Sequence, residues 1–350
     1  MVTIFSSWNN FAVQKILSPK TLPLLEFEIE EAIAKERASV FEDLASYPKE
    51  EESKNRPIQS MIVTTWRSGS TFLGKVLKSP PVYNYHYEPL HQFGIAQVRS
   101  GPIAHEAVSS LTQLLTCNYT GMEGYMKYNM RKNYQFIENK RMWSHCLAGG
   151  KANTKSYCWN VQFAAQYCKL FPFQSIKTVR MRLNLTESLV ADERMNVKIV
   201  LLVRDPRGTM VSRRATPWCR GHPDCEDPSR LCKDLEDDFH SFKKLRKKYP
   251  SRYKVIRYED LSLNPDQYIK DVMHFYGVPL HDDVGKYLAS HTAKTDKIPF
   301  MWRQHLNTTE VQTIQESCKP ALSLWGYNLY QEGENITTFE PVLQMGKFEL

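Results

Sequence analysis

The stretch between residues 61 and 77 places the strongest constraint on the fold. Its apolar start, residues 61–63, predicts a short buried strand, and a helix is predicted directly after the polar loop that follows. Such a strand-to-helix turn leaves backbone N–H groups pointing outward, where the helix dipole also favours negative charge. Gly69 lets the backbone approach an anion, and Arg67 adds a positive charge. The stretch therefore predicts a phosphate-binding turn, in which three hydroxyl residues favour the helix start: Ser68, Ser70 and Thr71.

The ATP-binding loop of P-loop proteins has a related design, G-x-x-x-x-G-K-[ST]. Gly69 fits its second glycine and Thr71 its final hydroxyl, but Thr64 stands at the first glycine and Ser70 at the lysine. The loop is therefore predicted to be a phosphate cradle without the lysine of an ATPase. An ordinary helix cap after a buried strand is the alternative.

A second unit of the same design begins at residue 197. The apolar run 197–203 predicts a buried strand, Arg204 follows it without a spacer, and Pro206 can open a helix. Arg204 at the strand end and Ser212 in the helix can converge on one dianionic group. In a parallel sheet both loops reach the carboxyl edge of the strands, where open α/β folds bind ligands. The two units predict two phosphate positions on a single ligand.

The remaining periodic segments alternate between strand and helix patterns. Strands are predicted over 82–88, 176–183 and 253–258, and a helix from Pro265 to Gly277. This alternation predicts an α/β fold with a P-loop-like parallel sheet and helices on both faces. No repeat or linker divides the chain, so one catalytic domain is expected. Its predicted bounds are 58–335, with a stem-like N-terminal segment at 1–57 and a C-terminal tail at 336–350.

The chain is basic, with a net charge of +8 from 46 basic and 38 acidic residues. Such a charge attracts nucleic acid, anionic lipid or sulfated glycans and does not choose among them. The apolar stretch from Phe11 to Leu25 is interrupted by charged residues and prolines, so neither a membrane span nor a signal peptide is predicted.

Glycosylation sequons and cysteines favour a secretory compartment. Eight cysteines would fit structural disulfides in an oxidising environment. A zinc site at Cys219, His222, Cys225 and Cys232 is the alternative, which the absence of a Cys-x-x-Cys pair disfavours. The four sequons begin at Asn118, Asn184, Asn307 and Asn335.

Five ordered segments between residues 58 and 330 resemble the Golgi carbohydrate 6-O-sulfotransferases, which act on N-acetylglucosamine, galactose or N-acetylgalactosamine. Residues 65–73 resemble the 5′-phosphosulfate loop of that family, and residues 202–208 with Ser212 resemble its 3′-phosphate loop. The other similar segments are 87–91, 257–261 and 302–327. The resemblance implies the sulfotransferase fold.

The resemblance also implies a reaction, its partners and its location. The donor would be 3′-phosphoadenosine 5′-phosphosulfate (PAPS), no metal would be used, and the acceptor would be a glycan or glycosaminoglycan. No nucleic-acid partner is expected. The family implies a Golgi lumenal location with membrane association, through an N-terminal anchor that this chain does not show, and a homodimer.

Carried over residue by residue, the resemblance predicts a donor site and two catalytic residues. Arg67 would offset charge on the departing phosphate. Glu88 would accept the hydroxyl proton, and burial beside the donor is expected to raise its pKa. The alternative is a Glu88 that only caps or salt-bridges a loop. The donor-binding residues are predicted to be Thr65, Trp66, Arg67, Ser68, Gly69, Ser70, Thr71, Arg204 and Ser212.

Several side chains near these motifs have two interpretations. His91 and His86 are weaker candidates for the base, because a lone histidine is more often structural. Trp302 and Arg303 could line the acceptor or adenine side, although helix packing explains Trp302 equally well. Acceptor choice is expected to depend on segments 92–145 and 214–232. Two other functions compete with sulfuryl transfer: a P-loop small-molecule kinase, and a non-catalytic basic glycan-binding protein.

Overall fold

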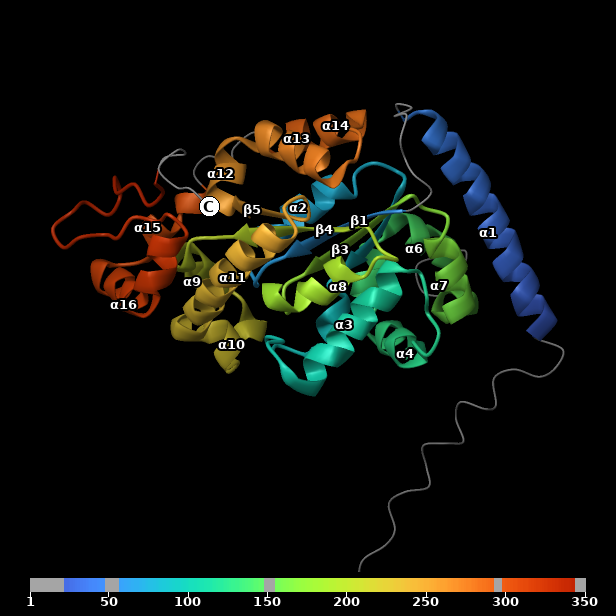
Figure 1. The fold of residues 1–350 in the computed structure, drawn as a ribbon, viewed down its shortest axis with the longest axis horizontal. Helices are drawn as coiled ribbons and strands as arrows, with labels where there is room; N and C mark the ends of the chain where they lie inside the picture. The colour runs from blue at the N-terminus through green and yellow to red at the C-terminus, as the bar shows by residue number, and fades with distance from the viewer. Residues whose placement is uncertain (1–21, 48–56, 148–154, 293–297, 344–350) are drawn as a thin grey trace, which may run out of the picture.

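The computed structural model describes residues 22–47, 57–147, 155–292 and 298–343. Its centre is a five-stranded parallel sheet with the strand order β2-β3-β1-β4-β5 (Figure 1). The predicted parallel α/β fold is therefore confirmed. The strands are β1 (Ile58–Val63), β2 (Tyr83–Tyr87), β3 (Phe173–Thr178), β4 (Val197–Val203) and β5 (Tyr253–Arg257).

The strand predicted over 176–183 is wrong in its bounds, because β3 begins and ends earlier in the chain. After Thr178 the chain leaves the sheet, and Arg180 and Arg182 pair instead with the backbone of Val98. Polar and apolar residues continue to alternate through this extended segment, so the alternation alone could not show where the strand ends.

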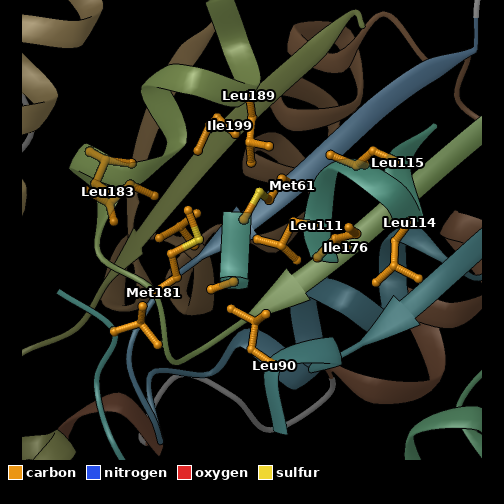
Figure 2. Close-up of a cluster of buried hydrophobic side chains, with 14 of the residues drawn as sticks. Met61, Leu90, Leu111, Leu114, Leu115, Ile176, Met181, Leu183, Leu189 and Ile199 are labelled. Carbon is orange, nitrogen blue, oxygen red and sulfur yellow. The ribbon is translucent and has the colours of Figure 1, made fainter. Parts of the chain in front are cut away.

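Alternating residues of the central strands face two hydrophobic clusters. Met61 and Ile199 face the larger cluster, which Figure 2 shows together with Leu111 of α3 and Leu189 of α8. Ile62, the next residue of β1, pairs with Val200 and faces the smaller cluster. Both faces of the sheet are therefore buried, as expected of parallel sheets.

Helices cover both faces of the sheet, as predicted (Figure 1). The helices that contribute to the smaller cluster are α2 (Ser70–Leu77), α12 (Tyr258–Leu263), α13 (Pro265–Tyr276) and α14 (Asp282–His291). Those that contribute to the larger cluster are α1 (Leu22–Ala45), α3 (Gly101–Leu115), α4 (Glu123–Arg131), α5 (Tyr134–Ile137), α6 (Lys140–Cys146), α7 (Val161–Cys168), α8 (Glu187–Ala191), α9 (Pro206–Arg214), α11 (Pro228–Lys248), α15 (Trp302–His305) and α16 (Thr308–Leu324). The short helix α10 (Pro223–Glu226) lies between α9 and α11 in the chain.

Helix α13 shows how local sequence sets the bounds of an element. Pro265 stands in the first turn, where its missing N–H leaves no intrahelical bond unmade. Gly277 ends the helix with a φ of 75°, a left-handed conformation that costs glycine little. The helix predicted between these two residues is confirmed.

The cysteines form disulfides, which confirms that prediction and makes the zinc alternative wrong. Cys219 pairs with Cys225, and Cys232 pairs with Cys318, so neither pair is available to a metal. Within the described ranges, no group of three or more His, Cys, Asp or Glu could hold a metal ion. The other two bonds are Cys117–Cys168 and Cys146–Cys158.

Segments on either side of the predicted catalytic domain pack against it. Helix α1 lies along the edge of the molecule against α7, and its Glu36 carboxylate binds Arg141 and His145 of α6 (Figure 1). Near the other end, the ring of Phe339 contacts Tyr330 with centroids 5.6 Å apart. The division at residues 57 and 335 stays a prediction. No helix among the described residues is both long and apolar enough to cross a membrane.

Removing the bond between α11 and α16 should destabilise the protein. Cys232→Ala with Cys318→Ala is expected to lower the free energy of unfolding by about 2–5 kcal/mol, as for other native disulfides. The matched control is Cys219→Ala with Cys225→Ala, which opens a loop with a separation of 6 residues instead of 86 and should cost less. Denaturant unfolding measures both, and an equal loss in the two variants would contradict this account.

Candidate active site

The carboxyl edge of the sheet holds a cavity of about 960 Å³. The cavity lies beside the neighbouring strands β1 and β4. After β1 the chain continues toward one end of the sheet, and after β4 it continues toward the other end. Open α/β folds bind ligands at such a position. Both predicted anion loops reach it. Predicted site residues on its wall are Trp66, Arg67, Gly69, Ser70, Thr71, Glu88, Arg204 and Ser212.

The loop after β1 has an unusual backbone conformation. Arg67 has a φ of 67° and Gly69 a φ of 84°, both left-handed. Gly69 also lies against the ring of Tyr258, because a Cβ at this position would be 2.2 Å from Tyr258 Cδ2. Only glycine satisfies both the conformation and the packing, and the helix α2 begins at the next residue, Ser70.

Two direct contacts join the loop after β1 to the unit after β4. Arg67 Nε donates to Ser212 Oγ over 2.9 Å, and Arg204 Nη1 donates to the backbone oxygen of Arg67 over 2.7 Å. The guanidinium of Arg204 also lies 4.5 Å from the ring centroid of Tyr258. Two cations from distant parts of the chain therefore share one rim of the cavity.

Some predicted donor residues lie beneath the loop. Thr65 is buried, and its hydroxyl accepts a hydrogen bond from Arg213. Trp66 is buried too, with the guanidinium of Arg180 5.6 Å and that of Arg213 5.7 Å from its ring. Ser68 also lies among the buried residues. The side chains of Thr65 and Trp66 support the loop, whereas Arg67 and Thr71 are exposed.

The polar groups at this rim fit an anionic ligand. Within the described chain, Ser68 Oγ and Arg204 Nε are buried and have no hydrogen-bond partner. Trp66 Nε1 in the first loop is in the same state. Buried donors usually have partners, so these three atoms within the two anion loops indicate a place for a further acceptor. A phosphate or sulfate oxygen is such an acceptor, and Arg67 would add charge-assisted bonds to it.

Glu88 lies at the end of β2 and is already paired. Its Oε1 accepts from Lys177 Nζ over 2.6 Å, and its Oε2 accepts from Arg180 Nη1 over 2.7 Å. Burial alone would raise the pKa of Glu88, but the two positive charges outweigh it and lower the pKa to about 2. The expectation of a raised pKa is wrong, and the carboxylate stays ionised within its salt bridges.

Lys177 and Arg180 were not singled out from the sequence. Lys177 is almost completely buried at the end of β3, where its ammonium lies 4.0 Å from the ring centroid of Tyr87. Burial lowers the pKa of Lys177, while the charge of Glu88 acts in the opposite direction. A lysine in an otherwise buried strand is a signal that a carboxylate lies nearby. The sequence does not show, however, that β2 and β3 are neighbours.

The two histidines near Glu88 differ in position. His91 lines the cavity, and its Nδ1 lies 2.5 Å from the hydroxyl of Tyr128. His86 is not on the cavity wall and lies 3.2 Å from the amide of Asn84. Burial lowers the pKa of both rings to about 4, so both are neutral at neutral pH.

The segment after β5 supports the Arg204 loop from below. Asp260 binds Arg257 over 2.6 Å, whereas Glu259 accepts from the backbone N–H of Asp205 over 3.1 Å. Burial and the charge of Asp205 raise the pKa of Glu259 to about 7. Asp260 therefore holds Arg257, and Glu259 holds the turn that carries Arg204.

The later segment, 302–327, contributes mainly packing. Trp302 is buried and lies under the guanidinium of Arg207, 4.6 Å from its ring centroid, although one edge reaches the cavity wall. Arg303 donates to the backbone oxygen of Phe339. Other wall residues that the sequence did not indicate are Tyr134, Trp218 and Tyr258.

Fold and site together define an α/β protein whose sheet edge is built to hold an anion between two loops. The chain matches the sulfotransferase domain family over residues 57–308, which is most of its length, and it belongs to that family. PAPS is the donor cosubstrate of this family and of this chain.

The curated relatives are carbohydrate sulfotransferases. Carbohydrate sulfotransferase 3 of Tetronarce californica is 26% identical over 329 residues, which cover 79% of this chain and 74% of that protein. Carbohydrate sulfotransferase 1 of Homo sapiens is 24% identical over 341 residues, covering 81% of this chain and 82% of that protein. The resemblance to carbohydrate sulfotransferases is confirmed.

Solved sulfotransferase structures also align with the chain. The sulfotransferase domain of the Synechococcus PCC 7002 olefin synthase has 17% identity and a TM-score of 0.41, covering 80% of this chain and 99% of that one. Mouse sulfotransferase SULT7A1, solved with 3′-phosphoadenosine 5′-phosphate (PAP), has 13% identity and a TM-score of 0.39, covering 81% of this chain and 88% of that one.

Gly69→Ala should disrupt the loop after β1. The left-handed conformation costs a non-glycine residue about 1–2 kcal/mol, and the added Cβ collides with Tyr258, so PAP affinity should fall at least about tenfold. Isothermal titration with PAP measures this change.

Gly285→Ala in α14 is the matched control, since nothing among the described residues lies within 4 Å of its added Cβ. This control should bind PAP as the unmodified protein does. Unchanged PAP affinity in Gly69→Ala would contradict the proposed conformation of the loop.

Proposed function

We propose that this protein transfers the sulfuryl group of PAPS to the 6-hydroxyl of N-acetylglucosamine, galactose or N-acetylgalactosamine in a glycan or glycosaminoglycan. The observation that carries the proposal is the pair of contacts from Arg67 to Ser212 and from Arg204 to Arg67. They bring the two anion loops to one rim. The names of the curated relatives support a carbohydrate acceptor, and the sequence resemblance supports the 6-hydroxyl position.

The donor would lie across the two loops. The backbone from residue 65 to residue 71 would hold the 5′-phosphosulfate, and Arg204 with Ser212 would hold the 3′-phosphate. Arg67 reaches Ser212 and is exposed toward the cavity, so its guanidinium can offset the charge that develops on the departing phosphate. PAPS supplies an activated sulfuryl group, whose bond to the 5′-phosphate breaks as the sugar oxygen bonds to sulfur.

Glu88 is the residue that would take the hydroxyl proton. Its low pKa makes it a weak base, but a sugar oxygen becomes strongly acidic as its bond to sulfur forms. In a loose transition state of the phosphoryl-transfer type the proton leaves late, so a weak carboxylate base suffices. Lys177 and Arg180 keep Glu88 ionised and therefore ready to accept the proton.

The cellular setting is part of the same proposal. All four sequon asparagines are exposed, and the cysteines are bonded in pairs, which supports folding in an oxidising lumen where glycans are attached. We place the protein in the Golgi lumen, associated with the Golgi membrane and as a homodimer, on the resemblance to its family.

Donor recognition is tested most directly by thermal stabilisation. A ligand that binds only the native state stabilises it and so raises the melting temperature. The stabilisation is about 2.7 kcal/mol when the ligand concentration is a hundred times the dissociation constant. PAP should produce such a shift, whereas ATP with magnesium should produce less, because Ser70 stands where a kinase loop has lysine. Stabilisation by ATP with magnesium alone would favour the kinase.

Replacing either cation of the rim should abolish measurable transfer. Arg67→Ala removes an interaction that strengthens in the transition state, so kcat should fall at least about 100-fold. Arg204→Ala removes a charged hydrogen-bond donor, so PAP affinity should fall by about 10- to 100-fold.

Radiolabelled sulfate transfer and PAP titration measure these two effects. Arg214→Ala is the control, because Arg214 lies on the same helix as Ser212 but forms an exposed pair with Glu310. Near-normal transfer by Arg67→Ala or by Arg204→Ala would contradict the proposed role of these residues in the donor site.

Glu88→Gln should lower kcat by about 10²- to 10⁴-fold and leave PAP affinity unchanged. A group with a depressed pKa loses its negative charge only as the pH falls through its folded value, about 2 for Glu88. Between about pH 5 and pH 8, kcat should therefore show no acid limb that depends on Glu88.

The pH profiles of the unmodified enzyme and of Glu88→Gln measure this. Glu138→Gln is the control, because Glu138 pairs with Lys78 and does not line the cavity. Full activity in Glu88→Gln would remove Glu88 from the role of base.

A further inference from the structure

Two exposed aromatic side chains lie on the cavity wall. Trp218 is 43% exposed and Tyr134 is 40% exposed, and both line the cavity. An exposed tryptophan is a large apolar surface left in water, and folding alone gives no reason to place it on the wall of a cavity that also holds charged side chains.

Trp218 is held in a defined position. It lies in the 3-10 turn Pro217–Cys219, and the next residue, Cys219, is bonded to Cys225. This disulfide closes a loop with a separation of 6 residues, so the backbone beside Trp218 has little freedom. The indole also meets the buried ring of Trp66 edge to face, with centroids 6.4 Å apart and an interplanar angle of 63°.

A chain of contacts places Trp218 on the Glu88 side of the cavity. Trp66, which Trp218 touches, lies beside Arg180, and Arg180 binds Glu88. Trp66 also directly precedes Arg67 and lies beside Arg213, so Trp218 borders the loop after β1 as well. Trp218 is therefore linked to the proposed base through Trp66 and Arg180.

Tyr134 belongs to a second aromatic group on the same side. Its ring meets Tyr87 with centroids 6.0 Å apart and His91 with centroids 5.1 Å apart, both edge to face. Tyr87 directly precedes Glu88. Acceptor choice is expected to depend on segments 92–145 and 214–232. Each segment contributes one aromatic side chain that is linked to Glu88, Tyr134 in the first and Trp218 in the second.

We propose that Trp218 is the platform on which the acceptor sugar ring stacks, with Tyr134 as a second aromatic contact. One face of a pyranose ring carries C–H groups and packs well on an aromatic surface, while its hydroxyls remain free for polar partners. A ring stacked on Trp218 is held on the same side of the cavity as Glu88. This inference rests on the proposed function and names the residue that would select and orient its acceptor.

The test compares acceptor and donor constants for Trp218→Ala and Trp218→Tyr. The acceptors are desulfated chondroitin and desulfated keratan oligosaccharides, with PAPS as donor. Loss of an aromatic contact should raise the acceptor KM about tenfold in Trp218→Ala, with kcat and the PAP dissociation constant changed less than about twofold. Trp218→Tyr keeps an aromatic face and should stay within about threefold of the unmodified KM.

Ile103→Ala is the matched control, because Ile103 is an exposed apolar residue outside the cavity wall. An unchanged acceptor KM in Trp218→Ala, with the unmodified protein active, would overturn the platform and leave the proposed function in place. No transfer by the unmodified protein to either glycan, with PAP still bound, would count against the proposed function instead.

Saturation-transfer NMR on the PAP-loaded protein gives a second measurement that does not require turnover. Irradiation of protein aromatic protons should reach the sugar ring C–H protons in the unmodified protein and lose most of that signal in Trp218→Ala. An equal signal in both proteins would overturn the platform.

Discussion

The hydrogen bond from Arg204 to the backbone oxygen of Arg67 is the interaction on which the site depends. It joins two loops that are 137 residues apart in the chain and places two guanidinium groups at one rim. Both guanidinium groups line the same cavity, where like charges repel, and the hydrogen bonds of the loops hold both groups in place. An anion of high charge relieves that repulsion when it binds. A nucleotide with phosphate groups at both ends is therefore a suitable ligand for this rim.

Glu88, Lys177 and Arg180 form a second charged group, in which one carboxylate is paired with two cations. The two cations keep the carboxylate ionised although it is largely shielded from water, which would otherwise favour its neutral form. Under the proposed function, the cationic rim would hold the donor, and the carboxylate with its aromatic neighbours would lie beside the acceptor sugar.

Much of the fold and of the donor side could be predicted from the sequence, because the signals are local. The apolar strand at 197–203 and the helix from Pro265 to Gly277 depend on residues a few positions apart. The loop from Arg67 to Gly69 is likewise a continuous stretch, and its left-handed glycine fits the turn. The end of β3 was placed wrongly, because an extended chain keeps the same alternation after it leaves the sheet.

Local sequence was enough to predict the class of fold and the two polar loops that meet at the cavity, since backbone conformation and helix dipoles follow from neighbouring residues. The state of Glu88, the disulfide partners and the position of Trp218 depend on contacts between distant parts of the folded chain. The carboxylate depends on Lys177 of the neighbouring strand β3 and on Arg180 just after that strand, and the indole depends on Trp66. The energy of a buried charge or ring is set by what lies beside it in space, and strand order and loop packing place those neighbours.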